Sequence, residues 1–293
     1  MNLILPFVID GALFKGRYVK IDSVMDELLA RRHYPPLVAQ ILAESITLAC
    51  MLADSIKYTG IFTLQIQGNG PVSLLVVDVT DSYEIRAYAQ YNEDKLPEGA
   101  KSVREIFGEG TLSFIADSPY NQTERYQGVV ALEGETLAQC AVKYFGQSEQ
   151  LLTQIMLFSQ AVPFGEQGDS FHYAAGGVMV QKMPEKKNTL LTDNTIDKWE
   201  EADILLKTLK KEELFDKKLL PEKLLFRLFH EHDLTIFPKK DIVFKCRCSK
   251  EKVEEMLKQF SKEERDSLYK NGTISVTCQF CGQEYTFQEK DFE

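Results

Sequence analysis

The sequence predicts an α+β protein in three parts. We expect an N-terminal mixed α+β domain with a central β-sheet over 1–184, a charged helical linker over 185–230 and a small C-terminal module over 231–293. Strand patterns precede and separate the helical patterns without a regular β-α alternation, which favours α+β over a doubly wound fold. Charged residues become dense after Met183, and four of the six cysteines lie in the last fifth of the chain.

Composition sets limits on the class of protein. With 293 residues, 44% of them hydrophobic and 27% charged, the chain has the make-up of a soluble globular protein with a sizeable core. A net charge of -10 argues against a specific nucleic-acid partner, because phosphate binding needs clustered Lys and Arg. We find no signal peptide at the N-terminus and expect no apolar stretch of about 18 residues that could span a bilayer. We therefore predict a cytoplasmic protein without a membrane partner, in which cysteine clusters are metal or redox sites.

The first elements are a strand pair and a long helix. Phe7, Ile9 and Ala12, together with Val19 and Ile21, indicate an opening strand pair, and we place the turn between the two strands at 14–17. The helix starts at Pro35 and Pro36, which are tolerated in a first turn. Its apolar side chains recur at spacings of three and four: Val38, Ile41, Leu42, Ile46, Ala49 and Leu52.

Five further strands and one helix complete the N-terminal prediction. Residues 60–79 form two strands around the turn 68–71, and the Gly-Asn-Gly there is no dinucleotide motif because a Val-rich strand follows it. Three more strands follow, and then a helix with Thr136 and Gln139 in capping-box spacing. Two apolar runs end the domain, and a Gly pair at 176–177 implies a turn, a bulge or a close backbone approach.

The two cysteines of this domain lie on predicted helices. Cys50 is part of the long apolar helix, and Cys140 lies in the helix that Thr136 begins. A free cysteine behaves as a small apolar residue when it is buried. We therefore predict that both belong to the core.

The linker combines dense charge with a sparse apolar stripe. Residues 185–223 contain nine basic and ten acidic side chains. Its apolar residues nevertheless approximate helical spacing: Ile196, Trp199, Leu205, Leu206, Leu209 and Leu214. Such helices depend on a packing partner for their stability, and Pro221 is expected to break the run.

The C-terminal module has a small predicted core. A strand ends at Cys246, Ser249 caps a helix, and Ser261 with Glu264 forms a capping box for a second helix. A hairpin follows over 273–287. A module of this size usually needs a staple, such as a metal.

The four remaining cysteines form two local pairs. Cys246 and Cys248 are separated by one residue, and Cys278 and Cys281 by two, at the bend of the predicted hairpin. Four thiolates in a reducing compartment suit one tetrahedral Zn²⁺ ion per chain, with Zn–S bonds of about 2.3 Å. His230 and His232 lie upstream and are possible ligands, but a full set of cysteines makes them unnecessary.

Thiolates are also the species that oxidants attack. A zinc ribbon generally presents two CxxC knuckles, whereas the first pair here is CxC. If each local pair closed into a disulfide, all four ligands would be lost. Structural zinc contributes about 10–16 kcal/mol in small modules, against about 5–15 kcal/mol for a whole domain, so loss of the metal should unfold this one. A disulfide over so short a loop restrains the chain far less.

Motifs along nearly the whole chain resemble the redox-regulated heat shock protein thirty-three family of chaperones. The resemblance is carried by CRC and CQFCG with their spacing, and by LFRLFHEHDLTIF, ERYQGVVALEGETLAQC, YFGQSEQ, AAGGVMVQKMP and GNGP. Leu152 departs from the family, whose members often carry Pro there; this touches a helix start and no site.

The resemblance implies a function and a mechanism. It implies an ATP-independent holdase chaperone rather than an enzyme, inactive while Cys246, Cys248, Cys278 and Cys281 hold zinc. Oxidation would form Cys246–Cys248 and Cys278–Cys281 disulfides, release zinc, unfold the module and loosen the linker. The active form, commonly a homodimer through the N-terminal domain, would bind unfolding client proteins.

Two other functions are compatible with a four-cysteine module. One is a zinc-ribbon nucleic-acid-binding protein, which the balanced charges of 249–271 disfavour. The other is a thiol oxidoreductase, whose reactive CxxC prefers a helix start, whereas Cys278 and Cys281 lie in a hairpin. His33 and His172 have no catalytic partner that the sequence can assign.

Overall fold

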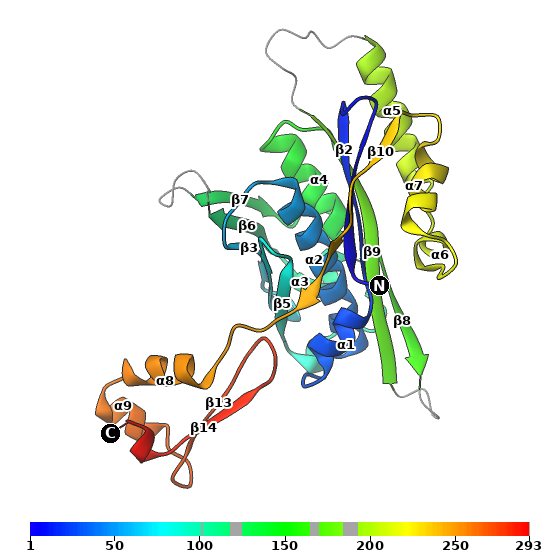
Figure 1. Cartoon of the computed structure of the whole chain (residues 1–293). Helices are drawn as coiled ribbons and strands as arrows, with labels where there is room; N and C mark the ends of the chain where they lie inside the picture. Colours follow the sequence, from blue (N-terminus) through cyan, green and yellow to red (C-terminus); the bar gives the residue numbers. More distant parts are fainter. Residues whose placement is uncertain (101, 118–124, 165–169, 184–192, 293) are drawn as a thin grey trace.

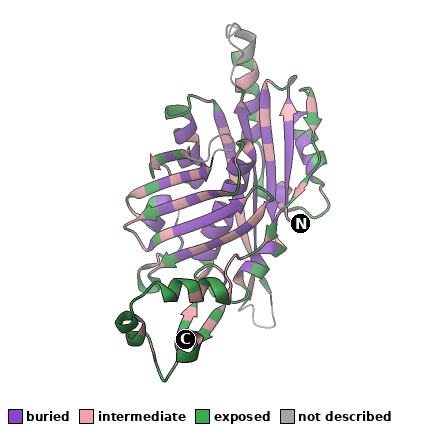
Figure 2. Ribbon diagram, turned by 60° about the vertical axis from the view of Figure 1, so that its left-hand side comes forward, coloured by how far each residue is buried: buried purple, intermediate pink, exposed green. Residues whose placement is uncertain are grey.

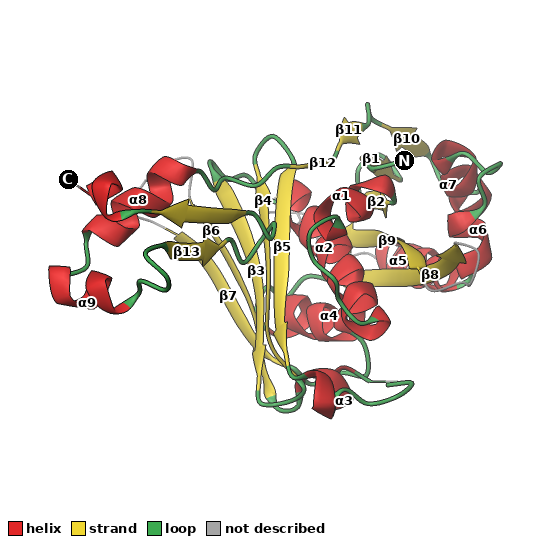
Figure 3. Cartoon of the chain, turned by 90° about the horizontal axis from the view of Figure 1, so that it is seen from below, coloured by secondary structure: helices red, strands yellow, loops and turns green. Residues whose placement is uncertain are grey.

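The computed structural model describes residues 1–100, 102–117, 125–164, 170–183 and 193–292. Figure 3 shows that helices fill the space between two β-sheets, that further helices cover the far side of one sheet, and that the C-terminal module projects from the other. The α+β fold class predicted from the sequence is confirmed. The single central sheet that we predicted is instead a pair of six-stranded sheets.

The first sheet, called sheet A here, joins the N-terminus to strands from the end of the linker. Its neighbouring strands are antiparallel, in the order β10-β1-β2-β9-β8, and β11 also pairs with β1. The strands are β1 (Leu3–Ile9), β2 (Phe14–Ile21), β8 (Thr153–Phe164), β9 (Ser170–Lys182), β10 (Leu234–Ile236) and β11 (Lys240–Asp241).

The second sheet, sheet B, follows the order β12-β5-β4-β3-β6-β7. Its strands are antiparallel except that the short β12 lies parallel to β5. They are β3 (Ile61–Gly68), β4 (Val72–Thr80), β5 (Glu84–Tyr91), β6 (Gly110–Asp117), β7 (Arg125–Ala131) and β12 (Val243–Phe244).

Between the sheets lies a helical layer around the predicted long helix. That helix is α2 (Pro36–Ser55), which contacts strands of both sheets and has Pro36 in its first turn. It is accompanied by α1 (Ser23–Leu29), α3 (Val103–Phe107) and α4 (Leu137–Gln147). The Thr136 hydroxyl caps α4 by accepting a hydrogen bond from the amide of Gln139, as expected.

Helix α2 also corrects one prediction. It is long and apolar enough to cross a membrane, although we expected no such stretch in the sequence. In the fold it is a core helix, because 78% of its apolar window is buried between the sheets. Its apolar character is explained by contacts on both sides.

The two sheets differ in how their faces are covered. In β1, and in β9 from Tyr173 to Gln181, consecutive residues are buried, as expected when both faces are packed. In β3 and β5 buried and half-buried residues alternate, so one face of sheet B lies against the helices and the other is partly open. Figure 2 shows the same contrast along the strands.

Linker helices cover the outer face of sheet A (Figure 1). They are α5 (Asp193–Lys207), α6 (Lys211–Phe215) and α7 (Pro221–Phe229). Leu206, Leu209 and Leu214 of the predicted stripe are buried, and Trp199 packs on Phe14 with ring centroids 5.7 Å apart.

Three details of the linker and the strands differ from prediction. Ile196 is 46% exposed, and Pro221 begins α7 instead of ending a helix. The first turn lies at Asp10–Leu13, where Asp10, Gly11 and Ala12 have positive φ, so the predicted turn at 14–17 falls within β2.

The Gly pair at 176–177 lies inside β9, where a Cβ at Gly177 would come within 2.1 Å of the Met156 carbonyl oxygen. Of the turn, the bulge and the close backbone approach that we considered, the close approach is correct. Residues 184–192, the start of the predicted linker, lie outside the described residues.

The C-terminal module is thinly packed. It contains α8 (Lys250–Lys258), α9 (Lys262–Ser267) and the hairpin β13 (Ile274–Thr277) and β14 (Glu284–Phe287). Ser249 caps α8, and the capping box of α9 is present. The buried apolar cluster consists of Leu257, Ile274 and Phe287, and Figure 2 shows the module as mostly exposed.

Residues 234–244 connect the linker to this module and pair with strands of both sheets, through β10, β11 and β12. The segment therefore belongs structurally to the two sheets, although the sequence assigned it to the module. The predicted domain boundaries at 184/185 and 230/231 stay predictions.

Candidate metal and redox site

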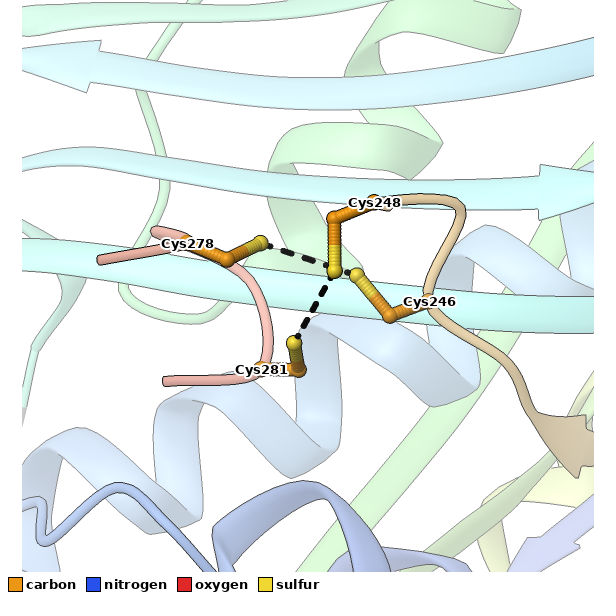
Figure 4. Close-up of side chains that lie close together, drawn as sticks. All are labelled: Cys246, Cys248, Cys278 and Cys281. Carbon is orange, nitrogen blue, oxygen red and sulfur yellow. Dashed lines mark hydrogen bonds between the residues drawn. The ribbon is translucent and has the colours of Figure 1, made fainter. Parts of the chain in front are cut away.

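The four C-terminal cysteines meet at one point, where the loop after β12 faces the bend of the β13–β14 hairpin (Figure 4). All four sulfur atoms lie within 4.8 Å of one another. Two of the sulfur contacts join the two loops: Cys246 Sγ lies 3.7 Å from Cys278 Sγ, and Cys248 Sγ lies 3.4 Å from Cys281 Sγ. All four are free thiols.

The backbone of the hairpin bend shapes half of this site. The amide of Cys278 donates to the carbonyl oxygen of Gln283, and the amide of Gly282 donates to that of Cys278, both at 2.9 Å. Gly282 has φ +70, a conformation that strongly favours glycine. The resulting knuckle turns both cysteine side chains toward Cys246 and Cys248.

The sulfur positions fit a tetrahedral metal. Four sulfurs about 2.3 Å from one ion would lie about 3.8 Å from each other, close to the observed cross-loop distances. A site made only of thiolates and closed on four sides is typical of structural zinc. Among the described residues, this is the only group of three or more His, Cys, Asp or Glu side chains whose ligand atoms all lie within 4.8 Å of one another, and it contains no histidine.

The free thiols differ in acidity. Burial raises the pKa of the Cys246 thiol and of the Cys281 thiol. Burial also acts to raise the pKa of Cys248, but hydrogen bonds from Tyr285 and the neighbouring thiols outweigh it, so this pKa lies below its ordinary value. The Tyr285 hydroxyl donates to Cys248 Sγ at 3.2 Å. The thiolate is the form that binds metal and reacts with oxidants, so the Tyr285 contact favours the reactive form of Cys248.

The other candidate residues lie away from this site. His232 is buried against Asp10, whose carboxylate is 2.9 Å from His232 Nδ1, and His230 is exposed at the end of α7. Cys50 and Cys140 are fully buried in the core, as predicted. Burial raises the pKa of Cys140 to about 11, so its thiol stays protonated and unreactive.

One pairing could not be found from the sequence. His172 on β9 contacts the carboxylates of Asp22 and Asp26 at the start of α1. Only the folding of α1 against β9 brings these three together. They lie outside the cysteine site.

The residue between the first two cysteines attaches the site to sheet B. Arg247 Nη2 lies 2.5 Å from Asp78 Oδ2, and Asp78 also receives a hydrogen bond from Thr63 and an ion pair from Arg86 at 2.8 Å. The side chain of Asp78 is only 7% exposed. The signal for this contact in the sequence is a single carboxylate in the Val-rich strand β4, which we did not interpret.

The hairpin loop is attached in the same way. Phe280, between the other two cysteines, lies against Tyr88 with ring centroids 4.7 Å apart. Arg32 Nη2 donates to the carbonyl oxygen of Cys278 at 2.9 Å, and a Cβ at Gly282 would lie 2.6 Å from the Arg31 carbonyl oxygen. The body of the protein therefore touches the spacer residues and the backbone of both cysteine pairs.

Comparisons with known proteins agree with this arrangement. The family model described as "Hsp33 protein" matches residues 2–288. The chain is 35% identical over 288 residues to a 33 kDa chaperonin of Shewanella loihica, covering 98% of this chain and 93% of the relative. It is 34% identical to the 33 kDa chaperonin of Escherichia coli, with 97% and 91% covered.

A solved structure also shares the fold. The crystal structure of the 33 kDa chaperonin (heat shock protein 33 homolog) of Thermotoga maritima superposes with a TM-score of 0.82 at 23% identity, covering 99% of this chain and 96% of that chain. With a family model that spans almost every residue and relatives that match end to end, this chain belongs to the Hsp33 family of chaperones.

Proposed function

We propose that the protein is a redox-regulated, ATP-independent holdase chaperone without enzymatic activity. In the reduced state Cys246, Cys248, Cys278 and Cys281 would hold one zinc ion, and the protein would be inactive. The main observation behind this proposal is how the module is held together. Among its described residues, three apolar side chains form a small core, and the four sulfurs are the only group that could bind a metal and so link its parts. Chemistry at those sulfurs therefore acts directly on the stability of the module.

Oxidation would act through two disulfides. In each pair, Cys246 with Cys248 and Cys278 with Cys281, two thiolates lose two electrons and form one S–S bond. Hydrogen peroxide accepts the electrons and takes up two protons to give two molecules of water, so two peroxide molecules oxidise the site. The sulfurs then cease to be ligands, and the site releases its metal. Because the observed close contacts cross between the loops, each pair must turn inward for this step.

Unfolding of the module must then affect the linker helices, which lie on the other side of the molecule. The module lies against sheet B, whereas the linker helices cover sheet A (Figure 1). The two are joined by the strands of residues 234–244, which pair with β1 and β5. Loss of the module would free the end of this segment, and α5 to α7 would then lose part of what holds them on the sheet.

Release of the linker would expose apolar surface on both partners. Leu206, Leu209 and Leu214 would leave the outer face of sheet A, where Phe14 and Val180 are also buried. Large exposed apolar patches bind exposed apolar segments of other proteins. Unfolding proteins are thus the proposed clients, in the cytoplasm, where thiols are reduced until stress. The active form would be a homodimer.

Peroxide treatment tests this function. Zinc release, counted with a chromophoric chelator, should reach one ion per chain, and suppression of the aggregation of a heat-unfolding client should rise with it. A Cys278→Ser, Cys281→Ser variant should lose zinc without oxidant, whereas Cys140→Ala should switch like the parent protein. Equal suppression by the reduced zinc-bound and oxidised zinc-free forms would contradict the proposal.

A further inference from the structure

A groove runs along the outer face of sheet B beside the C-terminal module. Its volume is about 460 Å³, and strands β3 to β6 line it together with Phe280 of the module. Ile61, Val76 and Ile115 form an apolar floor. This face is not the one that the linker helices cover, because those helices pack on sheet A.

Phe280 occupies one end of the groove as a side chain supplied from outside the sheet. Its ring is held between two residues of β5: the Arg86 guanidinium carbon lies 3.8 Å from the ring centroid, and the Tyr88 ring meets it edge-on at 4.7 Å. A cation over one face and an aromatic edge against the ring form a receptor for an aromatic side chain. Phe280 offers no ligand atom to a metal, but it lies between Cys278 and Cys281, so its place in the groove depends on the hairpin bend that these cysteines hold.

Arg247 is the second side chain of the module that binds to this face of sheet B. Its guanidinium reaches the Asp78 carboxylate, which is almost fully buried in β4. Asp78 keeps Thr63 and Arg86 as partners if Arg247 leaves, so the carboxylate stays in position to accept a new donor. The same stretch of sheet therefore accepts one aromatic and one guanidinium side chain.

We propose that this groove is a client-binding surface, and that the module occupies it as an internal ligand while zinc is bound. Its external ligand is an extended segment of an unfolded protein that carries an aromatic residue and an arginine. The inference rests on the proposed function, because unfolding of the module is what vacates the groove. Phe280 and Arg247 lie in the spacers of the two cysteine pairs, so loss of the metal and loss of the internal ligand are one event.

Photo-cross-linking can locate the client on this face. Gln65 lines the groove, whereas Gln127 lies on the same face of the same sheet but on the edge strand β7. A photo-reactive amino acid is placed at either position in the full chain. The probe is reduced, carboxymethylated hen lysozyme, which stays unfolded, has no thiol that could react with the switch, and is rich in arginine and aromatic residues. We expect cross-links from position 65 in the oxidised protein only, and few from position 127 in either state.

A substitution measures the contribution of the aromatic receptor. Tyr88→Ala should weaken binding of the same probe to the oxidised protein about tenfold, the effect of losing one aromatic contact at the centre of an interface. Val129→Ala is the control, because Val129 is 52% exposed on the outer side of β7 away from the groove. Thermal unfolding of both variants checks that the sheet is intact.

The outcomes separate this inference from the proposed function. One outcome is that oxidation releases zinc and promotes binding of the probe, while positions 65 and 127 cross-link equally and Tyr88→Ala binds like the parent protein. In that case the groove is not a client site, and the proposed redox-regulated function is unaffected. If oxidation neither releases zinc nor promotes binding, the proposed function fails first.

Discussion

The body of the protein and its C-terminal module are stabilised by different kinds of interaction. In the body, α2 is buried between two sheets in one large core, and a second buried cluster joins sheet A to the linker helices. In the module, three side chains are buried, and the hairpin has only two strands. An isolated two-stranded hairpin is marginal in water, so the module depends on what its four sulfurs hold.

This difference indicates which region of the protein can change its fold in response to a single chemical reaction. A body held by many contacts loses little when one contact changes, whereas a module held by one centre is lost when that centre reacts. The two regions also meet at the cysteine site, because the contacts between them include those of the spacer residues Arg247 and Phe280 and of the Cys278 carbonyl oxygen. Under the proposed function, oxidation would act on the weakest region of the fold and on its attachment together.

Removal of the metal should give the largest contrast between the two regions. With a strong chelator under reducing conditions, we expect the module to unfold, since it loses a contribution of about 10–16 kcal/mol. The body should keep its structure. Amide hydrogen exchange should show the largest loss of protection in α8, α9 and the β13–β14 hairpin, a smaller loss in residues 234–244 and the linker helices, and none in the strands β3 to β6.

Restoring zinc should restore that protection, which is the control for irreversible damage. Persistent protection of α8 and α9 in the metal-free protein would mean that Leu257, Ile274 and Phe287 suffice as a core. The proposed difference in what stabilises the two regions would then be wrong.

A matched pair of core substitutions sharpens the comparison. Phe114 and Phe287 are both buried phenylalanines, the first in the body and the second in the module. Phe114→Ala should lower the free energy of unfolding of the body by about 3–5 kcal/mol, the usual cost of such a cavity. Phe287→Ala should leave the body unchanged and speed release of the metal to a chelator.

The single tryptophan makes this measurable. Trp199 packs on Phe14 in sheet A, so its fluorescence follows unfolding of the body and linker in denaturant and does not report on the module. A shift of the fluorescence midpoint in Phe287→Ala would show that the two regions unfold together, contrary to expectation.

Local features of the fold could be predicted from the sequence because they depend on neighbouring residues. The start of α2 at Pro36, the caps at Thr136, Ser249 and Ser261, and the hairpin bend at Cys278 all follow from chemistry within a few positions. The four cysteines were identified as one group for the same reason, since two close pairs leave few other arrangements. Their redox roles stay a prediction.

Long-range placement could not be predicted. Nothing local shows that strands near residue 236 pair with β1, or that the N-terminal domain holds two sheets. Arg247 looks like any charged spacer until β4 brings Asp78 beneath it. The turn at Asp10–Leu13 was misplaced because positive φ at Asp10 and Ala12 is rare for such residues.

Lys240 tests the connection between the two regions. Its ammonium group contacts the fully buried carboxylate of Asp54, and the Tyr83 hydroxyl lies 2.7 Å away. Lys240→Met should raise the exchange rate of the amides of 240–245, with a cost of about 1–3 kcal/mol, because Asp54 keeps Arg17 as a partner but loses one charged donor. The zinc content should not change.

The neighbouring lysine is the matched control. Lys239 pairs with Asp241 at the exposed surface, and Lys239→Met should have little effect, as usual for exposed ion pairs. Equal effects of the two substitutions would mean that the buried carboxylate of Asp54 does not anchor this segment.

The smallest expected effect is a pH-dependent one inside the body. Burial acts to lower the pKa of His172, but hydrogen bonds to Asp22 and Asp26 outweigh it and raise the pKa above its ordinary value. Burial also opposes ionisation of Asp22, yet the hydrogen bond with His172 and the nearby N-terminus lower its pKa. The folded protein therefore favours charged forms of both groups.

The sign of the effect follows from these directions. A raised histidine pKa stabilises the fold fully below about pH 6.5, the ordinary value, and that contribution is lost as pH rises through the folded-state pKa. The lowered pKa of Asp22 stabilises above its ordinary value of 3.8 and is lost as pH falls. Both contributions are present together at about pH 5–6. His172 is 34% exposed and Asp26 is 51% exposed, so we expect less than about 1 kcal/mol.

His172→Gln should therefore lower the free energy of unfolding of the body near pH 5.5 and have little effect near pH 9, as measured by Trp199 fluorescence in denaturant. His230→Gln, at an exposed position on the end of α7, is the control for replacing a histidine without removing the Asp22 and Asp26 contacts. A loss of stability in His172→Gln that is the same at both pH values would indicate a packing effect instead of an ionic one. Since neither histidine lies at the cysteine site, the zinc content of both variants should match that of the parent protein, which keeps this test of the body separate from the state of the module.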